Sequence, residues 1–321
     1  MTAADGVISF SYDLYLLLVS VCHVMLLYLI VFHSPKSLHL FRLILVETSI
    51  FQLLKVFDEW FAQFVFLKDE KSIEIRSYGH CRHFQSGFGF IVYVIGQVAS
   101  VFSSASISVT FVFKYLSVTT LFASRSRLFS LFYLFHALAA IYLMSVYGTY
   151  RMTFRKPFDE EYYRNINLNS TEDSFSIVCK LPFESFPVIF STVVTYANLF
   201  YPIPLCWFVR KKIMIVLDRK RNVLSTIKQA EHKAFVTGLS IQVIVPFVSL
   251  PFTTGIYHFL VSQSLQEQRL ITVVVNFSVA LVEPLVSLYT VRPYRNKVKL
   301  WKSRFRGNVS PVVSTHTPSM A

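Results

Sequence analysis

The stretch LYLLLVSVCHVMLLYLIVF, residues 14–32, contains no Asp, Glu, Lys or Arg. A helix that crosses the hydrocarbon core of a bilayer needs about 20 mainly apolar residues. Residues 1–12 include Asp5 but no Lys or Arg, so they lack the basic segment of a cleavable signal peptide. We therefore expect the stretch to remain in the membrane as a first spanning helix.

Six further apolar stretches follow, and the composition agrees with a membrane protein. Of all residues 54% are hydrophobic and 15% are charged, whereas soluble domains carry about 25% charged residues. The sixth stretch contains Pro246 and Pro251, which a spanning helix tolerates where neighbouring helices satisfy the freed carbonyl groups. The sequence predicts an all-α membrane protein, a seven-transmembrane helix bundle that forms one domain over residues 1–306. The six later spans are expected at 40–67, 84–113, 128–148, 186–209, 234–261 and 270–291.

The basic residues between the spans predict the orientation. With the N-terminus outside, the inner connections and the C-terminal segment hold 20 Lys and Arg and the outer connections hold 10, as the positive-inside rule requires. The sequon Asn169-Ser170-Thr171 then lies in an outer loop, where Asn169 would be glycosylated. The net charge of +13 is better explained by an anionic membrane face than by nucleic acid.

Two different segments follow the seventh span. Residues 294–305 alternate apolar side chains with Lys and Arg, which predicts a short amphipathic helix on the inner leaflet. Residues 307–321 are rich in Ser, Thr and Pro, and we expect them to be a disordered cytoplasmic tail.

Cys81 and Cys179 both fall on the outer side in this topology, one before the third span and one before the fifth. That side is oxidising, so a disulfide between them would tie the second outer loop to the top of the third helix. The alternative is two free thiols. Cys22 and Cys206 lie in spans, where they act as small apolar fillers.

Polar side chains within spans are costly and therefore suggest function. Glu47, Gln242 and Glu283 lie at a similar depth in the inner half of the second, sixth and seventh spans. They are interpreted either as a polar layer that rearranges on activation or as a static network that fixes helix packing. Lys55 and Glu59 are four residues apart on one helix, and a simple ion pair explains them.

Signatures of catalysis are absent from the sequence. It contains no glycine-rich phosphate loop, no HExxH, no CxxC pair and no GxSxG motif, and its nine His residues are scattered. We therefore expect no enzyme activity, no cofactor and no metal site.

Four segments resemble nematode serpentine chemoreceptors, class delta above all. They are Ser34–Arg42 (SPKSLHLFR), Gly79–Phe84 (GHCRHF), Lys233–Phe235 followed by Ile241, Gln242 and Pro246, and Glu283–Leu285 followed by Tyr289 and Arg292–Arg295. The resemblance spans nearly the whole chain in the expected order. It implies a plasma-membrane receptor, in the ciliary membrane of chemosensory neurons, that detects an odorant or pheromone and signals through heterotrimeric G proteins.

The chain departs from the better-known rhodopsin-like pattern at two places. Phe113-Lys114-Tyr115 stands where Asp-Arg-Tyr would close the third helix. Glu283-Pro284, with Tyr289 five residues after the proline, stands where Asn-Pro-x-x-Tyr would close the seventh. The activation switches of that group are therefore not transferable, and coupling rests on family analogy.

A small-molecule pocket is expected in the outer half of the bundle, with aromatic walls and a few polar groups. For any one residue, ordinary core packing is the simpler explanation. The candidates are Phe90, Tyr93, Gln97, Phe190, Tyr196, Tyr257, His258 and Asn276.

The inner face carries clustered cations that anionic lipid alone would explain. The receptor interpretation adds that a G protein would meet Arg219, Lys220, Arg221, Arg292 and Arg295. A seven-span channel or transporter without G-protein coupling is the alternative function. Inverted channels keep their N-terminus inside, and transporters favour internal repeats, which this sequence lacks.

Overall fold

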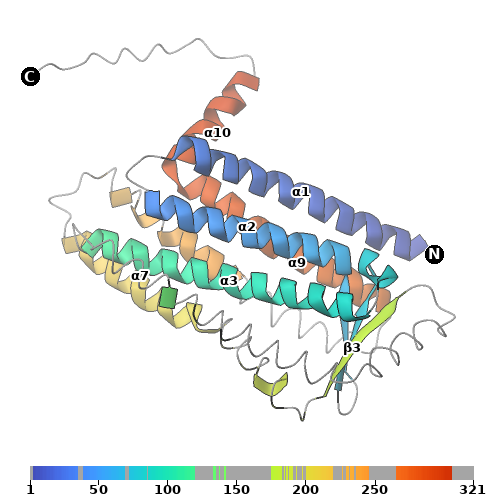
Figure 1. The fold of residues 1–321 in the computed structure, drawn as a ribbon. Helices are drawn as coiled ribbons and strands as arrows, with labels where there is room; N and C mark the ends of the chain where they lie inside the picture. The colour runs from blue at the N-terminus through green and yellow to red at the C-terminus, as the bar shows by residue number, and fades with distance from the viewer. Residues whose placement is uncertain are drawn as a thin grey trace, which may run out of the picture.

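A computed structural model describes residues 3–34, 39–68, 72–84, 86–119, 175–182, 200–219, 236–245 and 265–305, with scattered positions at 133–141, 184–197 and 226–234. Long helices form a bundle with a small sheet at one end, beside the N-terminus (Figure 1). The last helix turns away from the opposite end (Figure 1). The helices are α1 (Ala3–His33), α2 (His39–Ala62), α3 (Ser86–Thr119), α7 (Pro202–Arg219), α9 (Leu265–Thr290) and α10 (Arg292–Phe305).

Three described helices are long and apolar enough to cross a membrane: Asp5–His33, Ser86–Phe113 and Arg269–Thr290. A shorter apolar helix runs over His232–Val245. Although α2 is 24 residues long, it carries the ionisable side chains of Glu47, Lys55, Asp58 and Glu59, which lower its hydropathy. The chain is thus a mainly helical, multi-pass membrane protein.

The helices pack through three apolar clusters along the bundle. Near the sheet end, Tyr12 and Tyr15 of α1 meet Val56 of α2 and Val273 of α9. Toward the other end, Leu26 of α1, Leu45 of α2 and Leu288 of α9 form a second cluster, which Val298 and Trp301 of α10 join. The third cluster joins α3 to α7 and to the His232–Val245 helix through Phe111, Ile213 and Leu239.

A three-stranded antiparallel sheet closes the N-terminal end of the bundle. β1 (Phe64–Lys68) pairs with β2 (Ser72–Ser77), and β2 pairs with β3 (Ser176–Pro182), with a bulge between Ile75 and Arg76. The 3-10 helix η2 (His80–His83) leads from β2 into α3. We call β1, β2 and β3 the lid sheet.

The end of α2 is shaped by residues that follow β2. The carbonyl of Ala62 accepts hydrogen bonds from the backbone N–H of Gly79, at 3.0 Å, and from the hydroxyl of Ser77, at 2.7 Å. A Cβ atom at position 79 would lie 2.9 Å from the backbone carbon of Phe61, so only glycine fits there. Gln63 has φ 47°, a left-handed conformation that glycine usually takes at a helix end.

Several sequence-based boundaries are wrong. The second span was expected to continue as helix to residue 67, but α2 ends at Ala62 and 64–68 is a strand. The all-α expectation therefore missed the lid sheet. α1 is longer than 14–32, and α10 begins at Arg292 rather than Tyr294. The fourth span and the tail from 307 lie outside the described residues, apart from scattered positions of the former.

Candidate ligand and signalling sites

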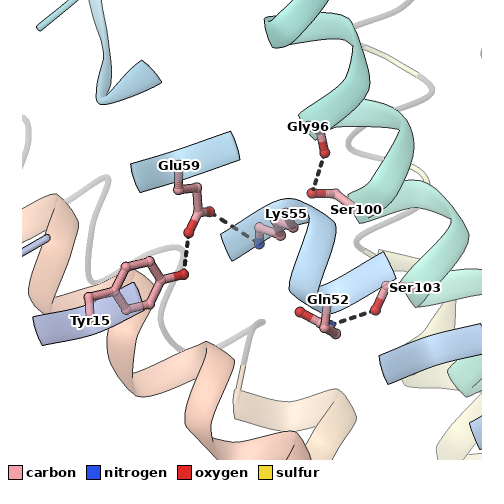
Figure 2. A network of polar contacts seen from close by, with 7 residues as sticks. All are labelled: Tyr15, Gln52, Lys55, Glu59, Gly96, Ser100 and Ser103. Atoms are coloured by element: carbon pink, nitrogen blue, oxygen red, sulfur yellow. Dashed lines mark hydrogen bonds and ion pairs between the residues drawn. The ribbon is translucent and has the colours of Figure 1, made fainter. Parts of the chain in front are cut away.

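A polar network crosses the bundle between α1 and α2. The Tyr15 hydroxyl donates a short hydrogen bond to Oε2 of Glu59, and Nζ of Lys55 lies 3.6 Å from Oε1 of the same carboxylate. Figure 2 shows these three side chains pointing toward one another from the two helices. The predicted Lys55–Glu59 ion pair is thus confirmed, with Tyr15 as an additional partner.

The network continues from α2 to α3. Nε2 of Gln52 donates to Oγ of Ser103 at 2.5 Å, and Ser100 bonds the carbonyl of Gly96 within α3 (Figure 2). Asp58 is buried against the same part of α3, where a Cβ atom at position 96 would lie 2.7 Å from its Cγ. Gly96 therefore makes room for a carboxyl group at the α2–α3 contact.

Charged side chains hold the lid sheet together. The carboxylate of Glu74 accepts a hydrogen bond from Nε of Arg76 at 2.5 Å. It also forms an ion pair with Nζ of Lys180 at 3.0 Å, and this pair joins β2 to β3. Burial raises the pKa of Glu74, but hydrogen bonds and charge from these two cations outweigh it and hold the pKa below its usual range. Arg76 also lies over the ring of Phe175, 4.4 Å from its centroid.

Arg269 connects three elements at the N-terminal end of the bundle. Its Nη1 donates to Oδ1 of Asp5 on α1 at 3.1 Å, and its Nη2 donates to Oε1 of Gln63 at 3.2 Å. The ring of Tyr78 lies 4.3 Å from the guanidinium carbon. Sequence reasoning did not single out this arginine.

Cys81 and Cys179 are both buried thiols in this structure. Burial raises the pKa of each, that of Cys81 to about 11. Both lie near one turn of α3, because a Cβ atom at Gly89 would be 3.6 Å from Sγ of Cys81 and 3.1 Å from Cγ2 of Val178. A disulfide between them stays a prediction.

The predicted pocket residues fall into three groups. Phe90 is fully buried in a cluster with Ile75 and Cys179, and the Tyr93 ring contacts the rings of Phe64 and Phe66. These two therefore support the lid sheet. Gln97, on α3, and Asn276, on α9, are half-buried. Phe190 stacks on Phe186, while Tyr196, Tyr257 and His258 lie outside the described residues.

The structure brings together two members of the predicted polar layer. Nε2 of Gln242 donates to the carbonyl oxygen of Glu283 at 3.2 Å and to Oγ of Ser287 at 3.1 Å. Glu47 is half-buried on α2. The buried side-chain amide of Gln242 thus joins the His232–Val245 helix to α9. Ser287 is a partner that the depth of residues along the sequence did not reveal.

Gly238 brings the same two spans into close contact. A Cβ atom at this position would lie 2.9 Å from Cγ1 of Val286 and 3.0 Å from Oγ1 of Thr290, and nearer still to another atom of Thr290. The contact lies one turn from Gln242 on the same helix. Residues 238–242 and 283–290 together are called the inner clasp below.

The cations predicted to lie on the inner face are partly within the described residues. Arg219 is exposed at the end of α7, and Arg292 is exposed at the start of α10, whereas Arg295 is half-buried over the ring of Tyr289, at 5.9 Å. Lys220 and Arg221 lie outside the described residues, as does the sequon residue Asn169. Oγ of Ser34 and the Tyr294 hydroxyl are hydrogen-bonded at 2.6 Å, although 260 positions separate them.

No group of three or more His, Cys, Asp or Glu side chains that could hold a metal ion is found within the described part of the chain. The described helices thus form a multi-pass bundle with buried polar contacts between helices distant in sequence, and such contacts within a membrane suggest functional sites.

Comparison with known proteins identifies the family. The model of the family described as "Serpentine type 7TM GPCR chemoreceptor Srd" matches residues 8–300. The chain is 30% identical over 308 residues to serpentine receptor class delta-40 of Caenorhabditis elegans, covering 94% of this chain and 95% of that one. It is 25% identical over 312 residues to serpentine receptor class delta-47 of the same organism, covering 96% and 98%. The protein belongs to the Srd family of serpentine chemoreceptors.

Family membership confirms the resemblance that the four sequence segments indicated. The fourth of those segments meets two of the others in space: the first through Tyr294 and Ser34, and the third through Glu283 and Gln242. Tyr15 and Arg269 were missed because each acts through partners far away in the sequence. The sequence offered one indication of these two residues. Each is a polar side chain, phenolic in Tyr15 and basic in Arg269, at the end of an otherwise apolar stretch.

Proposed function

We propose that this protein is a G-protein-coupled chemosensory receptor that detects a small molecule outside the cell. The match to the Srd family over residues 8–300 is the observation that carries the proposal. The distribution of Lys and Arg supports an N-terminus outside and a C-terminus inside across seven spans. The lid sheet and the polar network around Glu59 then lie toward the outside, where a ligand arrives.

The ligand is proposed to bind in the outer half of the bundle beneath the lid sheet. Gln97 and Asn276 are half-buried there, and Asn276 is next to Phe277, whose ring contacts Tyr15 of the polar network at 6.0 Å. Aromatic walls with a few polar groups suit an odorant or pheromone. Phe90 and Tyr93 serve the site indirectly, because they support the sheet above it.

Substitutions separate ligand contacts from structural ones. Alanine at Gln97 or Asn276, or Phe at Tyr257, is expected to shift the dose-response curve of an agonist at normal surface level. Phe90→Leu is the control, since it should lower the surface level by loosening the lid sheet and leave potency unchanged. Unchanged potency in all three pocket variants would refute this placement. The agonist itself comes from a ligand screen in cells that report calcium.

Signalling is proposed to begin at the inner clasp. Activation would separate the sixth span from the seventh, break the bonds of Gln242 and open a cavity on the inner face. Arg219 to Arg221 and the start of α10, at Arg292 and Arg295, would border that cavity. Their positive charge would also attract anionic lipid, so coupling and membrane binding are to be distinguished by experiment.

A further inference from the structure

Arg269 has unused capacity to bind an acceptor. Only 7% of the residue is exposed, and two of its nitrogens are bonded, Nη1 to Asp5 and Nη2 to Gln63. Its Nε is buried without a hydrogen-bond partner. A buried donor left unpaired is destabilising, so a ligand acceptor placed at this edge would relieve that cost.

The Asp5 carboxylate fills the site incompletely. Arg binds carboxylates most strongly when two parallel N–H groups donate to the two oxygens. Because Nε has no partner, Asp5 does not engage the Nε edge of the guanidinium. The side chain of Asp5 is 23% exposed against 7% for Arg269, so the acid is the more accessible partner of the pair and would regain hydration on leaving it.

We propose that Arg269 is the anion-binding group of the ligand site, that its ligand is a small organic monocarboxylate, and that Asp5 is an internal carboxylate that the ligand displaces. The ligand carboxylate would accept one hydrogen bond from Nε of Arg269 and a second from Nη1, which Asp5 would have released. The inference rests on the receptor function proposed above and adds the chemical class of the ligand.

The surroundings of Arg269 favour one negative charge and an apolar body. Ile8, Tyr12 and Val273 form a buried apolar cluster on the adjoining turns of α1 and α9. Tyr12 is close enough to interact electrostatically with both Arg269 and Glu59. A second acidic group on the ligand would face the Glu59 carboxylate, whereas a hydrocarbon chain would meet apolar side chains.

Displacement of Asp5 by a ligand would affect the junction of α2 with the lid sheet through Gln63, which contacts Arg269. This residue holds a left-handed backbone, φ 47°, while its side chain accepts from Arg269 and its carbonyl accepts from the N–H of Tyr78. A shift of the guanidinium toward a ligand would therefore act on the junction of α2 with the lid sheet.

The test uses purified full-length receptor in detergent with Trp60 as reporter. Trp60 donates to Oδ1 of Asp13 on α1 at 2.7 Å, and Phe in place of Trp207 and Trp301 removes the other two tryptophans. Sodium butyrate is titrated at constant ionic strength held with sodium chloride, with butylamine and butanol as controls. No G protein is needed, so failure here leaves the proposed receptor function standing with a neutral ligand.

Asp5→Asn is expected to tighten butyrate binding about fivefold to tenfold, because a competing charge-assisted bond is worth on the order of 1 kcal/mol. Asp218→Asn removes a carboxylate from a different ion pair, with Lys233 at 3.5 Å, and should leave the affinity unchanged. Arg269→Lys, which keeps the charge but loses the planar fork, should weaken binding at least tenfold. The proposal is overturned by equal or weaker butyrate binding in Asp5→Asn, by wild-type affinity in Arg269→Lys, or by a butanol response equal to that of butyrate. If Asp5→Asn does not accumulate, Arg269→Lys decides.

Discussion

Gly238→Ala should raise the basal activity of the receptor. The added methyl group would lie 2.9 Å from Cγ1 of Val286 and 3.0 Å from Oγ1 of Thr290, closer than ordinary van der Waals contact. Overpacking of this kind costs about 1–3 kcal/mol. The cost falls on the arrangement in which the inner clasp is closed, and it is relieved when the sixth and seventh spans separate.

The magnitude follows from a two-state equilibrium. If the separated state holds about 1% of the molecules, within the usual range for a minor state, a shift of 1.4 kcal/mol raises it to about 9%. A shift of 3 kcal/mol raises it to about 60%. Over the whole range of about 1–3 kcal/mol, basal signalling should therefore increase about fivefold to sixtyfold per receptor at the cell surface.

The assay is basal guanine-nucleotide exchange on a panel of Gα proteins, normalised to surface receptor. Gly6→Ala is the matched control, because a Cβ atom there would meet nothing within 4 Å and the substitution is again glycine to alanine within a helix. Equal basal exchange in Gly238→Ala, Gly6→Ala and wild type, at equal surface level, would refute the reasoning that the clasp restrains activation.

Three further predictions concern the lid sheet and the inner face. Because the pKa of Glu74 is lowered in the folded protein, its contribution to stability is present above the unfolded pKa of about 4.3 and is lost as the pH falls through the folded value. The hydrogen-exchange protection factors in β2 and β3, which correct for the intrinsic pH dependence of exchange, should therefore fall in acid, and Glu74→Gln should show that loss of protection already at pH 7. Replacing Cys81 or Cys179 by Ser should lower surface expression, and non-reducing mass mapping that finds both thiols free in the wild type would end the disulfide proposal. Neutralising the three cations 219–221 should reduce agonist-driven G-protein activation with insertion unchanged, whereas normal signalling from a correctly inserted variant would count against a coupling role.

The helices were predictable because hydropathy is a local property, but the lid sheet was not. Residues 64–68, FVFLK, continue an apolar run, and a short run of this kind does not distinguish strand from helix. The strand is decided by pairing with β2 and, through it, with β3 more than 100 positions later. Gln63 gave no signal either, since the left-handed end of α2 carries no glycine.

Some of the polar contacts could likewise be predicted from the sequence, and others could not. The Lys55–Glu59 pair follows from i, i+4 spacing, and the meeting of Gln242 with Glu283 follows from their equal depth. The bonds of Tyr15 with Glu59 and of Arg269 with Asp5 join positions 44 and 264 residues apart. Only the packing of α1 between α2 and α9 brings these partners together, and that packing depends on the whole set of apolar faces.

The proposed receptor has its N-terminus outside and its C-terminus inside the cell. Short epitope tags at the two ends, stained on intact and on permeabilised cells, test it most directly. The N-terminal tag should be stained on intact cells, and the C-terminal tag only after permeabilisation. Staining of the C-terminal tag on intact cells would contradict the account, because the basic inner face and the proposed G-protein contacts would then lie outside.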